Sequence, residues 1–237
     1  MKTFKKISEI SDFLQQKKNA GKSIGFVPTM GALHEGHLEL MRRAKSENDL
    51  LAVSIFVNPI QFNNPEDLKK YPRDLDNDSQ LLKSVACDVL FFPEVEEMYP
   101  EKITKTYDFG VLENVMEGAF RAGHFNGVAI VVQKLFEIIQ PTRAYFGEKD
   151  FQQLAVIQKL VQLESIPVEI VPCPIVRESD GLAMSSRNER LTAHERKLAP
   201  FIYNTLHSAK LKSTSVTVAE LKLLVENMFK DQPEFKL

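Results

Sequence analysis

Apolar and polar residues form alternating blocks along the chain, and these blocks predict strands and helices in turn. Nearly continuous apolar runs are typical of parallel strands that are covered on both faces. Such runs occur at residues 23–27, 50–57, 88–92, 143–146 and 168–171. Between them, apolar residues recur every three or four positions, as along one face of a helix. The alternation predicts an α/β fold: a doubly wound sheet of five parallel strands with right-handed crossovers.

The helical pattern covers most of the chain between and after these runs. It predicts helices at residues 8–19, 36–47, 75–85, 128–139, 151–164, 192–210 and 218–230. In the second of these, Leu38, Met41 and Ala44 are three residues apart and share one face. We also expect a short extra strand at residues 104–109 and a mobile, glycine-rich wall at residues 118–127.

The regular alternation ends near residue 177, which predicts a domain boundary there. Residues 178–190 are polar and loop-like, and two predicted helices joined by a Ser/Thr-rich turn follow them. We therefore expect a first domain at residues 1–176 and a second at residues 177–237. Roughly sixty residues are few for independent stability, so the second domain is expected to pack against the first.

The first predicted strand turns sharply into a helix within residues 26–38. Such a turn points the free N–H groups of the helix at whatever lies in it, and this electropositive end suits phosphate. Gly31 and Gly36 allow backbone to approach a ligand closely. His34 and His37 are three residues apart, so their imidazoles can face the same point. This stretch predicts a phosphate-binding turn.

Composition and charge narrow the class of partner. Of the 237 residues, 43% are hydrophobic and 26% are charged, which is ordinary for a globular protein with a real core. The net charge of -2 argues against a nucleic acid as the main partner but allows a nucleotide in a local basic pocket. Only Cys87 and Cys173 are present, and lone cysteines beside apolar residues favour free thiols in a reducing cytoplasm. No signal peptide and no membrane-spanning run is recognisable, so we expect no membrane partner.

Loops that follow three of the predicted strands should meet at the carboxyl edge of the sheet, where ligands bind in open α/β folds. They carry imidazole, amide, ammonium and carboxylate groups: His34, His37, Gln61, Lys149 and Asp150. Residues 184–187 could fold over them. These groups are mostly donors, as a triphosphate requires, and we find no nucleophile with an adjacent base. We therefore expect catalysis by positioning and charge stabilisation, without a covalent enzyme intermediate.

Six blocks of the sequence, in order, resemble signature blocks of the pantoate–β-alanine ligase (pantothenate synthetase) family. The blocks are residues 28–38, 56–62, 71–73, 123–128, 146–154 and 180–188. The first contains the H-x-G-H element that is shared with other nucleotidylyltransferases and class I aminoacyl-tRNA synthetases. That element alone is weak, but six blocks spread over most of residues 24–190 are specific. The resemblance implies a Rossmann-like fold of the HxGH nucleotidylyltransferase type.

The resemblance also implies a reaction. ATP and (R)-pantoate would form an enzyme-bound pantoyl adenylate and pyrophosphate, and β-alanine would then attack the activated carbonyl to give pantothenate and AMP. Residues 1–176 would bind nucleotide and pantoate, and residues 177–237 would form a lid. That lid would be incomplete, because the family usually continues beyond a position equivalent to Leu237. The family further implies Mg²⁺ on the ATP phosphates and a homodimer through the large domain.

The resemblance implies a role for each residue of this chain that matches a position of a family signature block. Catalytic contacts to phosphate are expected from His34, His37, Lys149, Ser185, Ser186 and Arg187. Further ATP contacts are expected at Met30, Gly31, Ala32, Leu33, Glu35, Gly36, Gly147, Glu148, Asp150, Val176 and Met184. Pantoate and β-alanine contacts are expected at Pro28, Thr29, Met30, Gln61 and Gln153. Asp78 is the candidate protein ligand of Mg²⁺, and the alternative is an ordinary surface position on a helix.

Two departures and two alternative functions stay open. Ala122 stands where many relatives have proline, so the wall at residues 118–127 is expected to be more mobile. The shortened lid is the second departure. One alternative is another HxGH nucleotidylyltransferase with a phosphate-bearing acceptor, which would need Lys or Arg where this chain has Gln61 and Gln153. The other is a non-catalytic nucleotide-binding protein with a shortened lid.

Overall fold

The structure, a computed structural model, describes residues 1–230 and 232–235. The chain divides into two compact units, Met1–Ile175 and Val176–Leu237. The first unit holds an α/β sheet and the second a small group of helices. Each unit is described separately below.

One sheet of six parallel strands forms the centre of the first unit, in the order β1-β4-β3-β2-β5-β6. The strands are β1 (Lys2–Phe4), β2 (Ile24–Thr29), β3 (Leu50–Ile55), β4 (Val89–Phe91), β5 (Arg143–Gly147) and β6 (Glu169–Cys173). The doubly wound parallel sheet is confirmed, with one strand more than predicted. The prediction lacks β1 because this three-residue edge strand, paired with β4, contains no apolar run.

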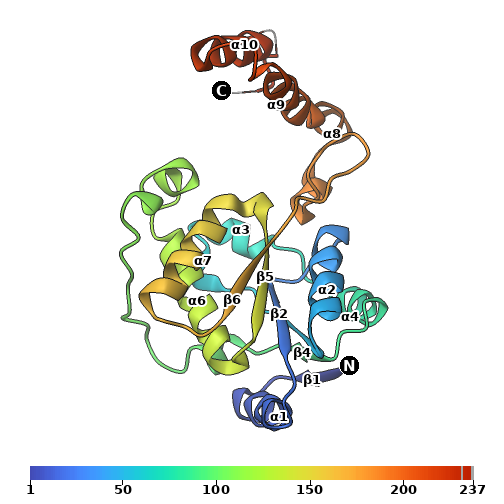
Figure 1. Cartoon of the computed structure of the whole chain (residues 1–237), viewed down its shortest axis with the longest axis vertical. Helices are drawn as coiled ribbons and strands as arrows, with labels where there is room; N and C mark the ends of the chain where they lie inside the picture. The colour runs from blue at the N-terminus through green and yellow to red at the C-terminus, as the bar shows by residue number, and fades with distance from the viewer. Residues whose placement is uncertain (231, 236–237) are drawn as a thin grey trace. The chain divides into compact units, whose positions relative to one another are not determined.

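Helices cover both faces of this sheet (Figure 1). They are α1 (Ile7–Asn19), α2 (Glu35–Glu47), α3 (Pro65–Lys69), α4 (Leu75–Ser84), α5 (Val95–Met98), α6 (His124–Ile139) and α7 (Phe151–Leu163). Short 3-10 turns lie between them: η1 (Pro59–Gln61), η2 (Gly110–Glu113), η3 (Met116–Phe120) and η4 (Glu148–Asp150). None of the helices in the described part of the chain has the length and apolar character needed to cross a bilayer.

The strands are apolar throughout because each face of the sheet carries its own hydrophobic core. Successive side chains of a strand point to opposite faces. Phe26 and Ala52 therefore pack with α1, α6 and α7, whereas Val27, Leu51 and Val53 pack with α2 and α4. Figure 1 shows α6 and α7 on one side of the sheet and α2 and α4 on the other. The burial of both faces explains why the strands could be recognised from sequence.

The strand order reverses direction beside β2, and this reversal locates the site. From β2 the chain moves outward to β3 and β4, and it then returns to the other side of β2 to form β5 and β6. The crevice between the carboxyl ends of β2 and β5 is a topological switch point. Ligands of open α/β sheets bind in such crevices.

Two predicted segments differ from the structure. Residues 104–109 contain no strand, because this stretch has no ladder partner among the described residues. The wall at residues 118–127 is partly helical: η3 covers its start, and α6 begins at His124 rather than at residue 128. A Cβ at Gly127 would lie 2.8 Å from the Cα of Gln61, so this glycine permits close packing of α6 on η1.

The second unit consists of η5 (Ser186–Arg190), α8 (Ala193–Leu198), α9 (Pro200–Lys212) and α10 (Val218–Lys230). The single helix predicted at residues 192–210 is therefore two helices, because Pro200 lacks an N–H and begins a new helix at its first turn. A small aromatic group holds the unit together. The ring centroid of Phe201 lies 5.1 Å from that of Phe229 and 5.6 Å from that of Phe235.

Candidate active site

The turn between β2 and α2 places two imidazoles side by side. The Nδ1 atom of His34 accepts a hydrogen bond from the backbone N–H of Gly36 at 3.1 Å, which caps the helix. The Nδ1 atom of His37 accepts from the backbone N–H of His34 at 3.4 Å. The two ring centroids are 4.1 Å apart. The capping box thus fixes both rings at the N-terminus of α2.

These bonds define what each imidazole offers a ligand. A neutral imidazole has one N–H and one acceptor nitrogen. Because Nδ1 accepts in both rings, the proton lies on Nε2, and each ring presents an Nε2–H donor. Burial lowers the pKa of His37 from 6.5 to about 3, and repulsion from Lys149 and from His34 in its protonated form acts in the same direction. Burial and Lys149 also lower the pKa of His34. Both rings are therefore neutral donors near pH 7.

A cation and an acid follow β5 at η4, close to the imidazole pair. The ammonium of Lys149 donates to Oδ1 of Asp150 at 3.0 Å. The positive charge of Lys149 lowers the pKa of both imidazoles, and the negative charge of Asp150 raises that of His34. The paired imidazoles and the Lys-Asp corner therefore belong to one electrostatic site, as the topology requires.

The η1 loop after β3 supplies a buried amide in a fixed orientation. Tyr99 donates its hydroxyl proton to Oδ1 of Asn58 at 2.9 Å, and Nδ2 of Asn58 donates to Oε1 of Gln61 at 3.1 Å. The Nε2 atom of Gln61 lies 3.1 Å from Sδ of Met30. Gln61 therefore has its oxygen occupied and its NH₂ group directed at the turn after β2. Neither Asn58 nor Tyr99 is among the predicted site residues; the signal for Asn58 is its place in the block at residues 56–62.

A cavity of about 180 Å³ lies at the switch point and joins these loops. One part of its lining comes from the carboxyl ends of the strands, the loops after them and the helix ends beside them. These residues are Pro28, Thr29, Met30, His37, Gln61, Gly147, Asp150 and Gln153. Its apolar lining comes from Leu40, Phe56, Val128, Val131, Val132, Leu135 and Phe146, with the rings of Tyr71 and Tyr145. Two carboxamides between apolar walls suit a small branched organic acid with hydroxyl groups.

In the second unit, the other predicted site residues share one loop. The backbone N–H of Met184 donates to the carbonyl of Val176 at 3.0 Å. Ser185 precedes η5, and its Oγ accepts from the backbone N–H of Arg187 at 3.3 Å. Ser186 is the first residue of that turn. The loop thus gathers Val176, Met184, Ser185, Ser186 and Arg187 within the unit.

Sequence comparison identifies the family. The sequence model of pantoate–β-alanine ligase matches residues 2–236. The chain belongs to the pantoate–β-alanine ligase family. It is 52% identical over 239 residues to a pantothenate synthetase of Christiangramia forsetii, covering 100% of this chain and 84% of that protein. It is 51% identical over 237 residues to the one of Bacteroides thetaiotaomicron, with the same coverage.

Solved structures of this family have the same fold. A pantothenate synthetase of Thermus thermophilus matches with a TM-score of 0.93 at 46% identity, covering 100% of this chain and 84% of that one. A pantoate–β-alanine ligase of Francisella tularensis, complexed with β-γ ATP and β-alanine, matches with a TM-score of 0.84 at 40% identity, covering 96% of this chain and 86% of that one. The chain is thus a ligase of the class that forms an amide bond.

Some residues predicted for the ligase site do not face the cavity. Glu35 is exposed, and its carboxylate pairs with Arg42 on the same helix. The backbone N–H groups of Ala32 and Leu33 both donate to the carboxylate of Asp78. Their hydrogen bonds are therefore used inside the protein, although the family resemblance implies ATP contacts for both residues.

The sequence leaves two interpretations of Asp78, a ligand of Mg²⁺ or an ordinary surface residue of a helix. The structure excludes the second. Only 2% of the surface of Asp78 is exposed to solvent. Its two carboxylate oxygens accept hydrogen bonds from the backbone N–H groups of Ala32, at 3.0 Å, and Leu33, at 2.8 Å. Burial raises the pKa of Asp78, whereas these two hydrogen bonds lower it. No group of three or more His, Cys, Asp or Glu side chains suited to a metal occurs in the described residues. The metal role of Asp78 stays a prediction, and the surface assignment is wrong.

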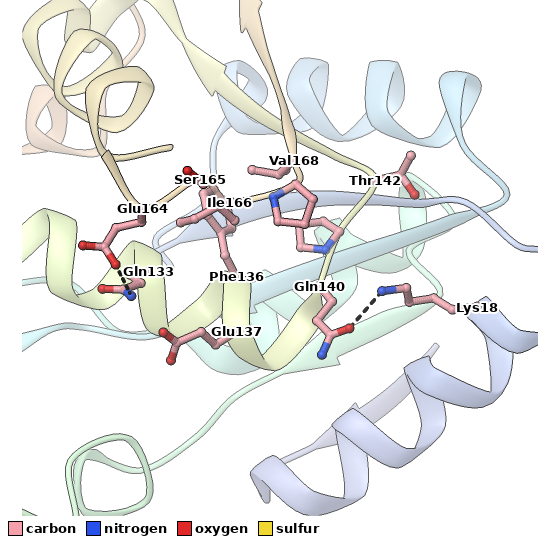
Figure 2. A pocket seen from close by; sticks show the side chains of 12 residues that line it. Lys18, Gln133, Phe136, Glu137, Gln140, Thr142, Glu164, Ser165, Ile166 and Val168 are labelled. Atoms are coloured by element: carbon pink, nitrogen blue, oxygen red, sulfur yellow. Dashed lines mark hydrogen bonds between the residues drawn. The ribbon is translucent and has the colours of Figure 1, made fainter. Parts of the chain in front are cut away.

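A larger cavity, of about 640 Å³, lies at the opposite edge of the ligase sheet. Figure 2 shows its lining side chains, which come from α1, from the end of α6 and from the segments that lead into β5 and β6. Lys18 donates to Gln140 at 2.9 Å across its rim. It contains none of the predicted site residues and faces the amino ends of the strands. Cavity size alone therefore does not select the active site.

Proposed function

We propose that the chain condenses pantoate with β-alanine through a pantoyl adenylate formed from ATP in the cavity at the switch point. The observation that carries this proposal is that His37 lines the same cavity as Gln61 and Gln153, while His34 and Lys149 lie close enough to lower the pKa of His37. The ATP and β-alanine bound by the Francisella tularensis ligase support it.

In the first step, a carboxylate oxygen of pantoate attacks the α-phosphorus of ATP. The bond from this phosphorus to the bridging oxygen breaks, and pyrophosphate leaves with the electron pair. Negative charge grows on the phosphate oxygens, where the Nε2–H groups of His34 and His37 can donate. Lys149 would exchange its hydrogen bond to Asp150 for a phosphate oxygen. Removing one such donor costs on the order of 3–4 kcal/mol of barrier.

In the second step, the neutral amine of β-alanine attacks the acyl carbonyl of the adenylate. The C–O bond to phosphate breaks, AMP leaves with the electron pair, and the new ammonium loses one proton to give the amide. Gln61 is proposed to lie beside the incoming amine. Because its oxygen is held by Asn58, its NH₂ group is the part available to substrate oxygen atoms.

Pantoate is proposed to lie between Gln61 and Gln153, near Pro28, Thr29 and Met30. Its two methyl groups match the apolar wall of the cavity. The two carboxamides bind hydroxyl and carboxylate groups without adding charge, so the carboxylate keeps its nucleophilicity.

The contacts proposed for ATP are given for each unit by itself. Gly147, Glu148 and Asp150 would bind the ribose side, and the backbone at Gly31 and Gly36 would lie beside the phosphates. In the second unit, backbone at Val176 and Met184 would contact adenine, and Ser185, Ser186 and Arg187 would bind the β- and γ-phosphates.

Mg²⁺ is proposed as a partner of the ATP phosphates. Both oxygens of Asp78 accept backbone hydrogen bonds, and the described residues contain no group of three or more His, Cys, Asp or Glu side chains that could hold a metal with it. Mg²⁺ keeps several waters and is often bound mainly through substrate phosphates. A phosphate-bound ion therefore fits this chain better than a protein-built site.

A cytoplasmic homodimer is part of the proposal. Four large apolar residues of the first unit are strongly exposed: Val111 at 72%, Met116 at 63%, Phe120 at 89% and Phe151 at 65%. They belong to neighbouring elements, because η2 contacts both η3 and α7. Such a patch is typical of protein interfaces. The free thiols of Cys87 and Cys173 are buried, which agrees with a reducing compartment.

Pyrophosphate exchange into ATP tests the function. Exchange should require pantoate and should not be supported by a phosphate-bearing acceptor, because the described residues that line the cavity include no Lys or Arg. Failure of pantoate to support exchange would overturn the proposal. ATP binding without AMP formation, in the presence of pantoate and β-alanine, would instead identify a non-catalytic nucleotide-binding protein.

A further inference from the structure

The turn that leads into the imidazole pair has an unusual backbone. Gly31 and Ala32 both have positive φ, at 81° and 51°. A non-glycine residue in this region costs roughly 1–2 kcal/mol. Successive backbone N–H groups in such a turn can point at one place and form an anion-binding nest. An anion at that point would compensate the cost of the turn.

The anion in this nest belongs to the protein. Asp78 reaches it from α4, 46 residues along the chain, and accepts from Ala32 at 3.0 Å and from Leu33 at 2.8 Å. Each oxygen receives its own N–H, and hydrogen bonds to a carboxylate are about twice as strong as neutral ones. The fit is close, since a Cβ at Gly31 would lie 2.9 Å from Oδ2 of Asp78. These two amides are therefore unavailable to phosphate in this conformation.

The turn that Asp78 binds, Gly31–Leu33, lies directly before His34. Leu33 is 7% exposed, and the next residue, His34, is the N-cap of α2. The backbone N–H of His34 in turn sets the ring of His37 through Nδ1. Any rotation of the turn would therefore move both Nε2–H groups. A misplacement of about 1 Å can cost roughly 100-fold in rate.

We propose that Asp78 is a positioning residue of this ligase: its carboxylate fills the nest of Gly31–Leu33 and thereby keeps both imidazole donors aimed at the α-phosphate. This inference rests on the proposed function. It replaces a metal-binding role for Asp78 with a backbone-holding one. The two roles are distinguished by experiment, because a carboxylate that holds the turn sets the imidazoles, whereas a metal ligand sets the affinity for Mg²⁺.

The test compares Asp78→Asn with Asp76→Asn in the full chain. Asp76 lies on the same helix, is exposed and loses the same charge, so it is the matched control. For both variants, three quantities are measured: kcat and KM in pantoate-dependent pyrophosphate exchange, the apparent affinity for Mg²⁺, and the ¹⁵N signals of the imidazoles in the folded protein without ATP. The last readout needs no catalysis, and a purely global effect on stability would leave it unchanged.

We expect kcat of Asp78→Asn to fall about 10- to 100-fold, with KM for pantoate changed less than the kcat and the affinity for Mg²⁺ unchanged. The ¹⁵N signals of His34 and His37 should move away from the values of the Nε2–H tautomer. The reason is that the hydrogen bonds from backbone N–H groups to their Nδ1 atoms are lost. Asp76→Asn should match the unchanged protein. If Asp78→Asn does not fold, the double variant Asp78→Asn/Ala32→Gly is made, because glycine adopts the left-handed turn without the cost that alanine has. The same imidazole signals are then measured in the double variant.

Unchanged imidazole signals in a folded Asp78→Asn variant would overturn the proposal, whatever the rate. A weaker affinity for Mg²⁺ with those signals unchanged would instead make Asp78 a metal ligand. The proposed function can fail separately. If the unchanged protein shows no pantoate-dependent exchange, the reaction assignment is wrong, while the imidazole signals still decide whether Asp78 holds the turn.

Discussion

Lowering the pH should destabilise the folded chain through His37. In the folded state its pKa falls from the ordinary 6.5 to about 3, mainly because of burial and then because of nearby positive charge. Between these two values the unfolded chain binds a proton that the folded chain does not. Stability from this group is therefore complete above about pH 6.5 and is lost progressively as the pH falls toward 3.

The magnitude follows from the size of the shift. Each pH unit between the two pKa values costs about 1.4 kcal/mol. From pH 7 to pH 5 the loss due to His37 is about 2 kcal/mol by this relation. That is a large part of the roughly 5–15 kcal/mol that stabilises a typical domain. The effect should therefore be visible in equilibrium unfolding.

The experiment compares the unchanged chain with His37→Gln, which keeps a polar side chain but does not titrate. Urea unfolding is followed by circular dichroism at pH 5, 6, 7 and 8, and the imidazole of His37 is titrated by NMR in the folded chain. We expect the pH dependence between 7 and 5 to be about 2 kcal/mol smaller in the variant. Equal pH dependence in the two proteins, or an NMR titration near pH 6.5, would refute the reasoning.

Three further predictions concern the site and its walls. Lys149→Ala should lower kcat for pyrophosphate exchange by about 100-fold or more with little change in the urea midpoint, because its ammonium pairs with Asp150 at the loop surface; a comparable loss of stability would contradict a direct role. Gln153→Ala should mainly raise the KM for pantoate, and steady-state kinetics that give an unchanged KM would exclude the amide as a pantoate contact. Gly127→Ala should destabilise the chain by about 1–3 kcal/mol, because its Cβ would lie 2.8 Å from backbone atoms of the Gln61 loop; a melting temperature equal to that of the unchanged chain would show that the loop yields freely.

The sheet could be predicted because parallel strands covered on both faces must be apolar without interruption. The same physics explains the failures. β1 is a three-residue edge strand with a largely exposed burial pattern, so it carries no such signal. The break at Pro200 is local: apolar residues continue through it at helical spacing, and only the missing N–H of proline separates α8 from α9.

Part of the site could also be predicted, because the carboxyl ends of parallel strands meet at one edge. His37, Gln61 and Asp150 line one cavity for that reason. The contacts that orient them could not be predicted. Tyr99 acts on Asn58 from 41 residues away, and Asp78 acts on the turn from 46 residues away. Nothing in the local pattern of a helix shows that one of its carboxylates will hold a distant backbone.

The electrostatic design of the site suits attack by a weak nucleophile. An imidazolium beside pantoate would pair with its carboxylate and withdraw the charge needed for attack on phosphorus. Burial and the charge of Lys149 instead keep His37 and His34 neutral. Neutral N–H groups can still donate to phosphate oxygens as charge develops there. The neighbouring cation, Lys149, is held by Asp150 until another anion competes for it. In the proposed arrangement the phosphate would receive these donors, and the carboxylate of pantoate would meet the neutral amides of Gln61 and Gln153.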